Sequence, residues 1–562
     1  MITRNISSIF AWICVSCLAA RCEIIPSTNL IAWSLDIVGV PGGIPNRTAI
    51  FTNLSAGSTA AEINNAISLC PSNSVVLLGS GTFEVTNAIS LGYKAGVTLR
   101  GAGRANTIIL GNIATGGAII ASGQQSLSAA VAITGGYTKG SSNITVAGTN
   151  GVVPGTLLVL YQNNDTNLIW SRWGADQLLR QMVRVTAVSS GEITFWPPLV
   201  WTFESGLSPE YKYQNGSHSM LSGIEDLTIR AGTNSASAYN VWLSGTYGCW
   251  LKNVESDNAA NVHVFMSRVL RNEVRECYMH DTSSDNDGYG VELYNEATGV
   301  LIEDNMMTRG FAGIVANQTV GSVFAYNFNT NAISSVFPHQ IGSMNANHGA
   351  HGMMNLWEGN VTEQFQNDGY HGSTSHLTIF RNRFHGLHGL YTSNRKTVDL
   401  CRYSHWHSVV GNVLGDAAWI PIDYQMTNGQ PTYADTQAIF RLGYPNMGSN
   451  AYNSTNPPSN VDNPGLDPNV IQTLLIHGNY DYLTDDTVWN GDIDDHTIPA
   501  SLFRTEKPSY FGGVSWPPIG PDVSGLVKMI PAEYRFLGLD LPSTLPTVTA
   551  NTVNVGTLII AP

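Results

Sequence analysis

Short apolar segments recur along the middle of the chain, each followed by Asn or Asp and then by a polar turn. Asn305 and Asn327 are 22 residues apart, and so are Asn360 and Asn382. A repeat of this length, with no helical period inside it, is typical of a parallel β-helix, whereas a β-propeller needs blades of roughly 40 residues. The repeats lie at 224–229, 250–256, 274–279, 301–307, 323–328, 355–361, 379–384 and 409–414.

The coils of a β-helix bury their apolar faces only by stacking on one another, about 4.8 Å apart. The recurring Asn is therefore expected at one turn position, where stacked amides form a hydrogen-bonded ladder and Asn tolerates left-handed backbone geometry. The 22-residue register also predicts that Glu358 stacks on Phe380. It places Arg381 about one coil spacing from the turn at 358–360.

The regions that flank the repeat predict a capped solenoid with one insertion. Ala61, Ile63, Ala66 and Ile67 have helical spacing, so a short amphipathic helix is expected to cover the first coil. The expected fold class is all-β: a parallel β-helix, right-handed by the family resemblance given below, with an N-terminal helical cap and an inserted small β-domain. The predicted divisions are a signal peptide at 1–20, the N-terminal cap and first coils at 21–122, the inserted domain at 123–220, the main β-helix at 221–420, and a C-terminal cap with long loops at 421–562.

One family resemblance follows from the N-terminal motifs. A helix, then VVLLGSGTFEV, then GVTLRGAG, then Asn-bearing coils resembles the pectate-lyase-like superfamily of right-handed β-helix proteins, over about 40–120 and 220–420. The resemblance implies a protein that acts on polysaccharides, but the superfamily includes lyases, hydrolases, epimerases and phage tailspikes. The four-part signature of polygalacturonase-type hydrolases is not found, nor is the arginine and calcium-aspartate set of pectate lyases. No catalytic residue is therefore transferred from the family.

Composition narrows the function further. Charged residues make up 12% of the chain, the net charge is −14 and only 27 residues are Lys or Arg, which argues against a general nucleic-acid binder. No long apolar run predicts a membrane span. Arg4, the apolar segment 9–18 and Ala19-Ala20 read as a secretory signal cleaved near Ala20, with a lipidated Cys22 as the alternative. We expect a monomer that is secreted, periplasmic or on the cell surface.

Histidines concentrate where the repeat is clearest. Nine of the 14 lie between 339 and 407, and groups that titrate near neutral pH suit a proton-transferring site. The stacking register predicts that Glu358, Asp368, His371 and Arg381 converge on one exposed wall, with His351 approaching from the earlier coil.

Two enzymatic reactions fit these residues. In β-elimination on a uronic-acid-containing glycan, which we favour, Arg381 neutralises the substrate carboxylate and His351 or His371 removes a proton. Tyr370 or Tyr391 then protonates the leaving oxygen. In the alternative, an inverting hydrolase, Glu358 and Asp368 form the carboxylate pair, about 6.5–9.5 Å apart. The expected substrate-binding residues are His348, His376, Arg383, Tyr370, Tyr391, Arg402 and Trp357.

Other readings of the same residues stay open. Arg381, Arg383 and Arg402 lie in a locally basic stretch that suits an acidic glycan. Asp285, Asp287 and Glu292 suit Ca²⁺, and otherwise no cofactor is expected. A transition-metal site would use His348, His351, His371 and His376. The non-enzymatic alternative is a carbohydrate-binding or surface β-solenoid.

Overall fold

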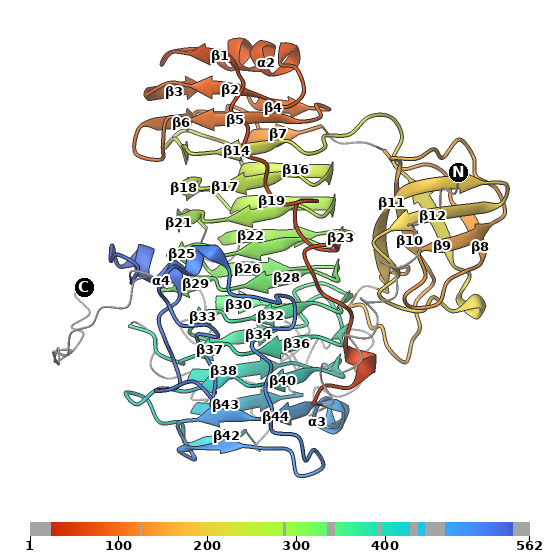
Figure 1. The fold of residues 1–562 in the computed structure, drawn as a ribbon, viewed down its shortest axis with the longest axis vertical. Coiled ribbons are helices and arrows are strands. Elements are labelled where there is room, and N and C mark those ends of the chain that lie inside the picture. Colours follow the sequence, from red (N-terminus) through yellow and green to blue (C-terminus); the bar gives the residue numbers. More distant parts are fainter. Residues whose placement is uncertain are drawn as a thin grey trace, which may run out of the picture.

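The computed structural model describes residues 24–123, 126–172, 174–284, 288–333, 343–389, 395–426, 437–443 and 467–542. It confirms the predicted fold class: the chain winds into a right-handed parallel β-helix built from three long sheets, which we name A, B and C (Figure 1). One coil adds a strand to A, then to B, then one or two strands to C. Among the described residues, no helix is long and apolar enough to cross a membrane.

Sheet A consists of β1 (Ile50–Leu54), β2 (Ser74–Leu78), β5 (Val97–Gly101), β14 (Gly223–Glu225), β17 (Trp250–Lys252), β20 (Glu273–Arg275), β24 (Leu301–Glu303), β28 (Val323–Ala325), β32 (Leu356–Glu358), β36 (Thr378–Phe380), β40 (Ser408–Val410) and β44 (Leu475–His477). Sheet B consists of β3 (Gly81–Val85), β6 (Thr107–Gly111), β15 (Thr228–Ala231), β18 (Glu255–Ala259), β21 (Tyr278–Thr282), β25 (Met306–Thr308), β29 (Phe328–Thr330), β33 (Val361–Thr362), β37 (Arg383–Phe384), β41 (Val413–Leu414), β45 (Asn479–Asp481) and the antiparallel β46 (Asp486–Val488).

Sheet C consists of β4 (Ile89–Gly92), β7 (Ala118–Ser122), β16 (Tyr239–Tyr247), β19 (Val262–Leu270), β22 (Tyr289–Tyr294), β23 (Ala297–Thr298), β26 (Ala312–Ala316), β27 (Thr319–Val320), β30 (Ser343–Asn345), β31 (Gly352–Met353), β34 (Phe365–Asn367), β35 (Thr374–Ser375), β38 (Arg395–Leu400), β39 (Ser404–His405), β42 (Asp423–Gln425) and β43 (Gln437–Leu442).

An asparagine ladder runs along the turn between sheets A and B, as predicted. Each side-chain amide donates to the Asn oxygen of the next coil, at 2.8–3.0 Å, from Asn305 to Asn479. The left-handed residue is the one before each Asn and not the Asn itself, for example Tyr326 and Arg381. The Asn side chains can therefore point inward, while the left-handed residue points its side chain out of the coil.

The core of the solenoid follows the alternation of each strand. On sheet A, Ile302, Phe324, Trp357, Ile379 and Val409 occupy matching positions on successive coils, and all are buried in the central apolar cluster. Stacked β-branched and aromatic side chains fill the cylinder because each coil presents the same inward position to the next.

The two ends and one side of the solenoid are covered. Helix α2 (Ala60–Leu69) begins with a capping box between Thr59 and Glu62 and buries Ile63 and Ile67 against the first coil. The short helices α3 (Pro468–Thr473) and α4 (Pro531–Phe536) lie near the other end and beside β25, respectively. Single 3₁₀ turns occur at Ser27–Asn29, Ser205–Leu207 and Ser509–Phe511.

The predicted insertion is a closed antiparallel barrel beside the solenoid (Figure 1). Its strands are β8 (Val131–Gly135), β9 (Asn143–Val146), β10 (Leu157–Tyr161), β11 (Arg180–Ser189), β12 (Glu192–Trp196) and β13 (Glu210–Tyr213). The barrel contacts sheet C through β11, where the Met182 amide donates to the Thr298 hydroxyl at 2.9 Å, and through its 168–178 loop. Ser171 forms an antiparallel bridge with Gly372, and Trp170 stacks on Tyr403 with ring centroids 5.2 Å apart.

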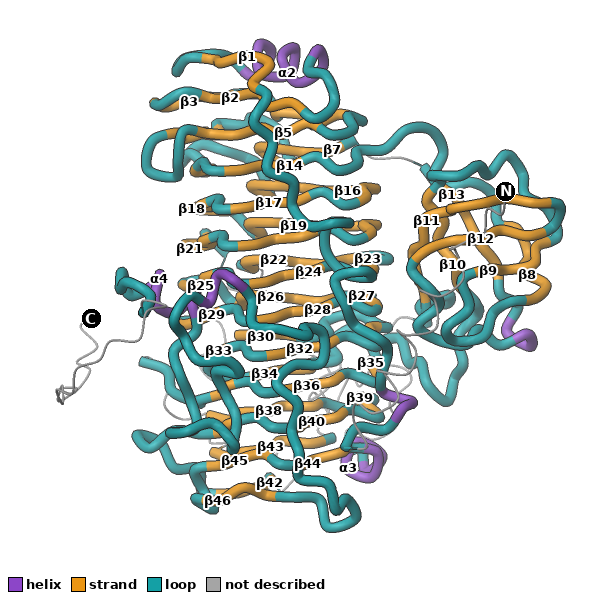
Figure 2. Tube along the Cα trace, in the orientation of Figure 1, coloured by secondary structure: helices purple, strands orange, loops and turns teal. Residues whose placement is uncertain are grey.

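Two chain segments cover the outer face of sheet A (Figure 2). Trp33 and Val38 come from the N-terminal segment, whereas Phe503, Phe511 and Val514 come from the C-terminal segment. They pack on outward residues of sheet A such as Leu356 and Phe380, so this face is closed to solvent where the segments lie.

Candidate active-site groove on sheet C

The predicted convergence of Glu358, Asp368, His371 and Arg381 on one exposed wall is wrong. The predicted stacking is present, since Glu358 pairs with Phe380 across sheet A. However, Glu358 and Arg381 lie under the C-terminal segment, whereas Asp368 and His371 follow β34 on sheet C. The segment that covers Glu358 and Arg381 is more than 100 residues away in sequence. The repeat pattern therefore does not predict that they are buried.

The Glu358 side chain is fully buried, and each of its two carboxylate oxygens accepts a hydrogen bond. The hydroxyl of Tyr326 donates to its Oε1 at 2.7 Å, and the Leu502 amide donates to its Oε2 at 2.9 Å. Burial raises the pKa of Glu358 to about 7. Glu358 and Asp368 therefore do not form the carboxylate pair of an inverting hydrolase.

Arg381 is likewise a structural residue. Its guanidinium donates to both oxygens of Asp522, at 2.7 Å each, and to the carbonyls of Ile498, Pro499 and Ile519. Only 1% of the residue is exposed. With these donors engaged, Arg381 is not available to a substrate carboxylate in this structure.

Other predicted binding residues are also buried or paired. Trp357 lies in the inward row of sheet A, stacked on Phe324 with ring centroids 4.1 Å apart. Arg383 pairs with Asp416 and packs over Tyr482, and Arg402 packs over Tyr403. The expected basic patch is therefore not a single exposed surface. Tyr391 lies outside the described residues.

His351 and His376 are packed residues rather than groove residues. The two ring nitrogens of His351 contact the hydroxyls of Ser373 and Ser375 at 2.9 and 2.8 Å, and burial lowers its pKa to about 3. His376 lies between Trp406 and the barrel residue Trp201. Among the described residues, His348, His351, His371 and His376 do not form a metal-ligand group.

A groove of about 480 Å³ opens on the outer face of sheet C, where the barrel loop meets the solenoid. Ser171, Ala175 and Leu178 form its barrel side. The solenoid side brings together Tyr239, Tyr289, Glu292, Tyr294, His348 and His371. We call this the sheet C groove. It contains two of the predicted histidines, His348 and His371. Asp368 contacts His348, and Tyr370 contacts both rings.

His348 and Asp368 form the ionisable pair of this groove. His348 Nδ1 lies 2.9 Å from Asp368 Oδ2, and the carboxylate also accepts from the Asn345 side chain and the Tyr370 amide. Burial alone would raise the pKa of Asp368, but His348 and these amides outweigh it and hold the pKa below its ordinary value. Asp368 is therefore an anion that orients the His348 ring.

His371 and Tyr370 complete the cluster. The His348 and His371 rings meet edge to face at 4.6 Å, and Tyr370 stacks on His348 at 5.1 Å. Burial and the neighbouring His348 lower the pKa of His371 to about 4, so His371 is neutral at neutral pH. The guanidinium of Arg172 lies 4.9 Å from the centre of the Tyr370 ring and brings a positive charge from the barrel.

Glu292 is tied to the same cluster through Asn317. The Asn317 amide donates to Glu292 at 3.0 Å, while its oxygen accepts from the His348 backbone amide, also at 3.0 Å. Glu292 was predicted as a calcium ligand with Asp285 and Asp287, which lie outside the described residues. The calcium prediction therefore stays a prediction.

A row of aromatic rings leads into the groove. Trp242, Phe265 and Glu292 occupy matching outward positions on β16, β19 and β22. Tyr239 stacks on Phe265 at 4.6 Å, and Phe265 lies 6.1 Å from Tyr294, which is 42% exposed. We call Tyr239, Trp242, Phe265 and Tyr294 the aromatic strip. Sequence reasoning missed it, although the 23-residue spacing of Trp242 and Phe265 matches the coil period.

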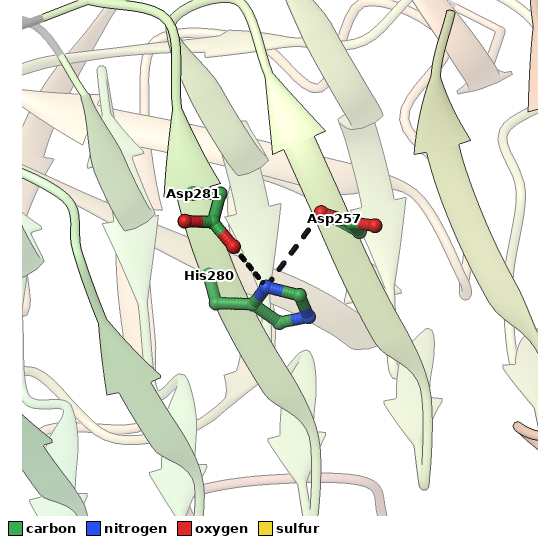
Figure 3. A group of neighbouring side chains, drawn as sticks. All are labelled: Asp257, His280 and Asp281. Carbon is green, nitrogen blue, oxygen red and sulfur yellow. Dashed lines mark hydrogen bonds and ion pairs between the residues drawn. The ribbon is translucent and has the colours of Figure 1, made fainter.

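One group of metal-ligand type lies on another face. Asp257, His280 and Asp281 come together on the outside of sheet B (Figure 3). Arg309 pairs with Asp281, and Arg230 pairs with Asp257, at 2.5 Å each. Because both carboxylates are already neutralised by arginines, this group does not fit a cation site.

No protein-family model matches the sequence, and no curated protein matches it. Among solved structures, the chain is similar to the tailspike protein gp49 from Pseudomonas phage LKA1, at 14% identity and a TM-score of 0.40, over 63% of this chain and 69% of that one. It is similar to an alginate lyase from Paenibacillus sp. str. FPU-7, at 12% identity and a TM-score of 0.36, over 64% and 94%. It is also similar to a polygalacturonase from Erwinia carotovora ssp. carotovora, at 12% identity and a TM-score of 0.33, over 70% and 94%.

Proposed function

We propose that the protein is a secreted enzyme that cleaves a uronic-acid-containing polysaccharide by β-elimination in the sheet C groove. The observation that carries the proposal is the His348–Asp368 pair at the groove, beside a neutral His371. A carboxylate on Nδ1 holds a histidine in the tautomer that leaves Nε2 as a base. His348 thus replaces His351 and His371 as the expected base.

The elimination assigns one task to each group. His348 takes the proton from the carbon next to the substrate carboxylate, and that electron pair forms a carbon–carbon double bond. The bond to the glycosidic oxygen breaks, and Tyr370 supplies the proton that this oxygen needs. Arg172 stabilises the negative charge that develops on the carboxylate during proton removal.

The surroundings of the pair favour elimination over hydrolysis. Hydrolysis with inversion needs two carboxylates on either side of the bond. Glu292 lines the groove, but the carboxylate of Asp368 is buried and engaged by His348, Asn345 and Tyr370. Among the described lining residues, Glu292 is the single acid. The aromatic strip offers apolar ring surface on which sugar rings can pack.

A panel of acidic and neutral polysaccharides tests the proposal. Each is incubated with the protein, and the products are read both for new reducing ends and for the ultraviolet absorbance of an unsaturated sugar. The proposal expects both signals on an acidic glycan. Reducing ends without absorbance would indicate hydrolysis, and silence on every substrate would favour a binding protein; either result overturns the proposed reaction.

A further inference from the structure

A second cavity, of about 510 Å³, opens on the outer face of sheet B, away from the sheet C groove. Side chains along strands β18 and β21 alternate between the core and the outer face. Ser256 and Met279 point into the core, so their neighbours Glu255 and Tyr278 point outward, and these two residues pair across the sheet. Helix α4 closes one side of the cavity with Arg535 and Phe536, and the turn at 103–106 closes the other with Arg104. We call this the sheet B pocket.

Arg104 provides the pocket with an available positive charge. Its carbonyl accepts from Thr228, but among the described residues no hydrogen bond or ion pair of its guanidinium is found. Arg535, the other lining cation, already donates to Asp304. Five N–H donors in a planar fork make Arg104 a receptor for a carboxylate or a similar anion.

Glu255 provides a fixed acceptor in the same pocket. His280 Nε2 lies 3.2 Å from Glu255 Oε1, and His280 Nδ1 lies 2.7 Å from Asp281. This contact makes His280 the hydrogen-bond partner of Glu255 in the pocket. Glu255 therefore stays an oriented carboxylate whose remaining lone pairs can accept hydroxyl groups.

The aromatic side of the pocket supplies apolar contact. Tyr278 stacks on His280 with ring centroids 4.3 Å apart, and Phe536 meets Tyr278 edge to face at 6.3 Å. A ligand that fits has an anionic group for Arg104, hydroxyl donors for Glu255, and a ring face for Tyr278 and Phe536. A sugar acid carries all three.

We propose that the sheet B pocket binds one sugar-acid unit, with its carboxylate on Arg104, its hydroxyls on Glu255 and its ring against Tyr278. The pocket is a binding site without a catalytic role. The ligand proposed for the pocket belongs to the same chemical class, acidic sugars, as the substrate of the proposed function. The residues that argue for the pocket are different from those of the groove. A polymer held here would be tethered on a face different from the one that carries the groove.

Ligand-observed NMR with glucuronate tests the pocket. Glucose serves as the neutral probe and acetate as the anion without a ring. Wild type is compared with Arg104→Gln, which removes the cation, and with Arg230→Gln, which removes the same charge from the same face but does not line the pocket. We expect Arg104→Gln to weaken glucuronate binding by about tenfold or more, and Arg230→Gln to leave it unchanged.

A His348→Ala variant separates the two proposals, because it removes the proposed base of the groove and leaves every lining residue of the pocket in place. Arg104→Gln should keep the wild-type cleavage rate on a short substrate, whereas His348→Ala should keep pocket binding. Equal binding of glucuronate by wild type and Arg104→Gln would overturn the pocket, and so would equal affinity for glucose. Either result leaves the groove chemistry untouched, and a protein that cleaves no polysaccharide can still bind glucuronate on sheet B.

Discussion

His348 Nδ1 lies 2.9 Å from Oδ2 of the buried Asp368, and this pair borders a groove where the solenoid meets the barrel. The His348 ring also contacts His371 and Tyr370. The buried anion Asp368 and the neutral His371 thus lie in one loop, and the oriented ring of His348 reaches them from the preceding coil.

His348→Ala and Asp368→Asn are expected to lower kcat by about 10²–10⁴-fold, because the first removes the base and the second loses the charge that orients it. Steady-state cleavage of the responsive polysaccharide measures the loss. His405→Gln is the matched control, since His405 and Asp467 form a similar pair, at 2.9 Å, that does not line the groove. Equal losses in all three variants would indicate a structural effect and contradict the assignment.

Substitution in the aromatic strip is expected to affect binding more than chemistry. Phe265→Ala and Trp242→Ala should raise KM for long oligosaccharides about tenfold with little change in kcat, because the rings provide contact surface outside the reacting centre. Trp406→Ala is the control, as Trp406 is 36% exposed but packs on His376 rather than in the groove. A fall in kcat with unchanged KM would show that the strip does not bind substrate.

Arg381→Ala is expected to destabilise the fold by about 3–5 kcal/mol, mainly because it leaves three carbonyls without their donor, and also because the half-exposed Asp522 loses its partner. Chemical unfolding measures the loss, and limited proteolysis reports release of the C-terminal segment. Arg309→Ala, which breaks a half-exposed pair with Asp281, should cost about 1 kcal/mol or less. Normal stability together with lost activity would restore Arg381 as a catalytic residue.

Glu358→Gln is expected to change how stability depends on pH. Burial raises the pKa of Glu358 to about 7, above the ordinary 4.5. The folded state therefore keeps a proton that the unfolded chain releases, and the stability contributed by this group is full below pH 4.5 and lost as pH rises through 7.

Glutamine cannot ionise, so the stability of Glu358→Gln relative to wild type should increase from pH 4.5 to pH 8, by up to about 3 kcal/mol. Thermal unfolding at both ends of this range measures it. Glu506→Gln, an exposed change in the same C-terminal segment, should show no such trend. A constant difference across the range would mean that the Glu358 carboxyl titrates normally.

The solenoid could be predicted from the sequence because its determinants are local and repeated. The spacing of Asn305, Asn327, Asn360 and Asn382 is the coil period itself, and the amide ladder follows from it. The same register correctly placed Glu358 on Phe380. The register predicts which residues of successive coils lie on top of one another, and a repeat in the sequence contains this kind of information.

The site could be predicted only in part, because exposure depends on segments outside the repeat. Strand alternation alone would have turned Trp357 inward, whereas the burial of Glu358 and Arg381 needs a C-terminal segment more than 100 residues away. The sequence could group Asp368, Tyr370 and His371 because they lie in a single loop. The contact of Asp368 with His348 joins this loop to an earlier coil, and the barrel loop that walls the groove comes from a separate domain.

A crystal structure of His348→Ala with a bound uronic-acid oligosaccharide tests the central claim most directly. The account predicts sugar density in the sheet C groove, with rings on the aromatic strip and the hydrogen next to a carboxylate facing the vacated imidazole position beside Asp368. An oligosaccharide bound elsewhere on the solenoid, with the groove filled by solvent alone, would contradict it.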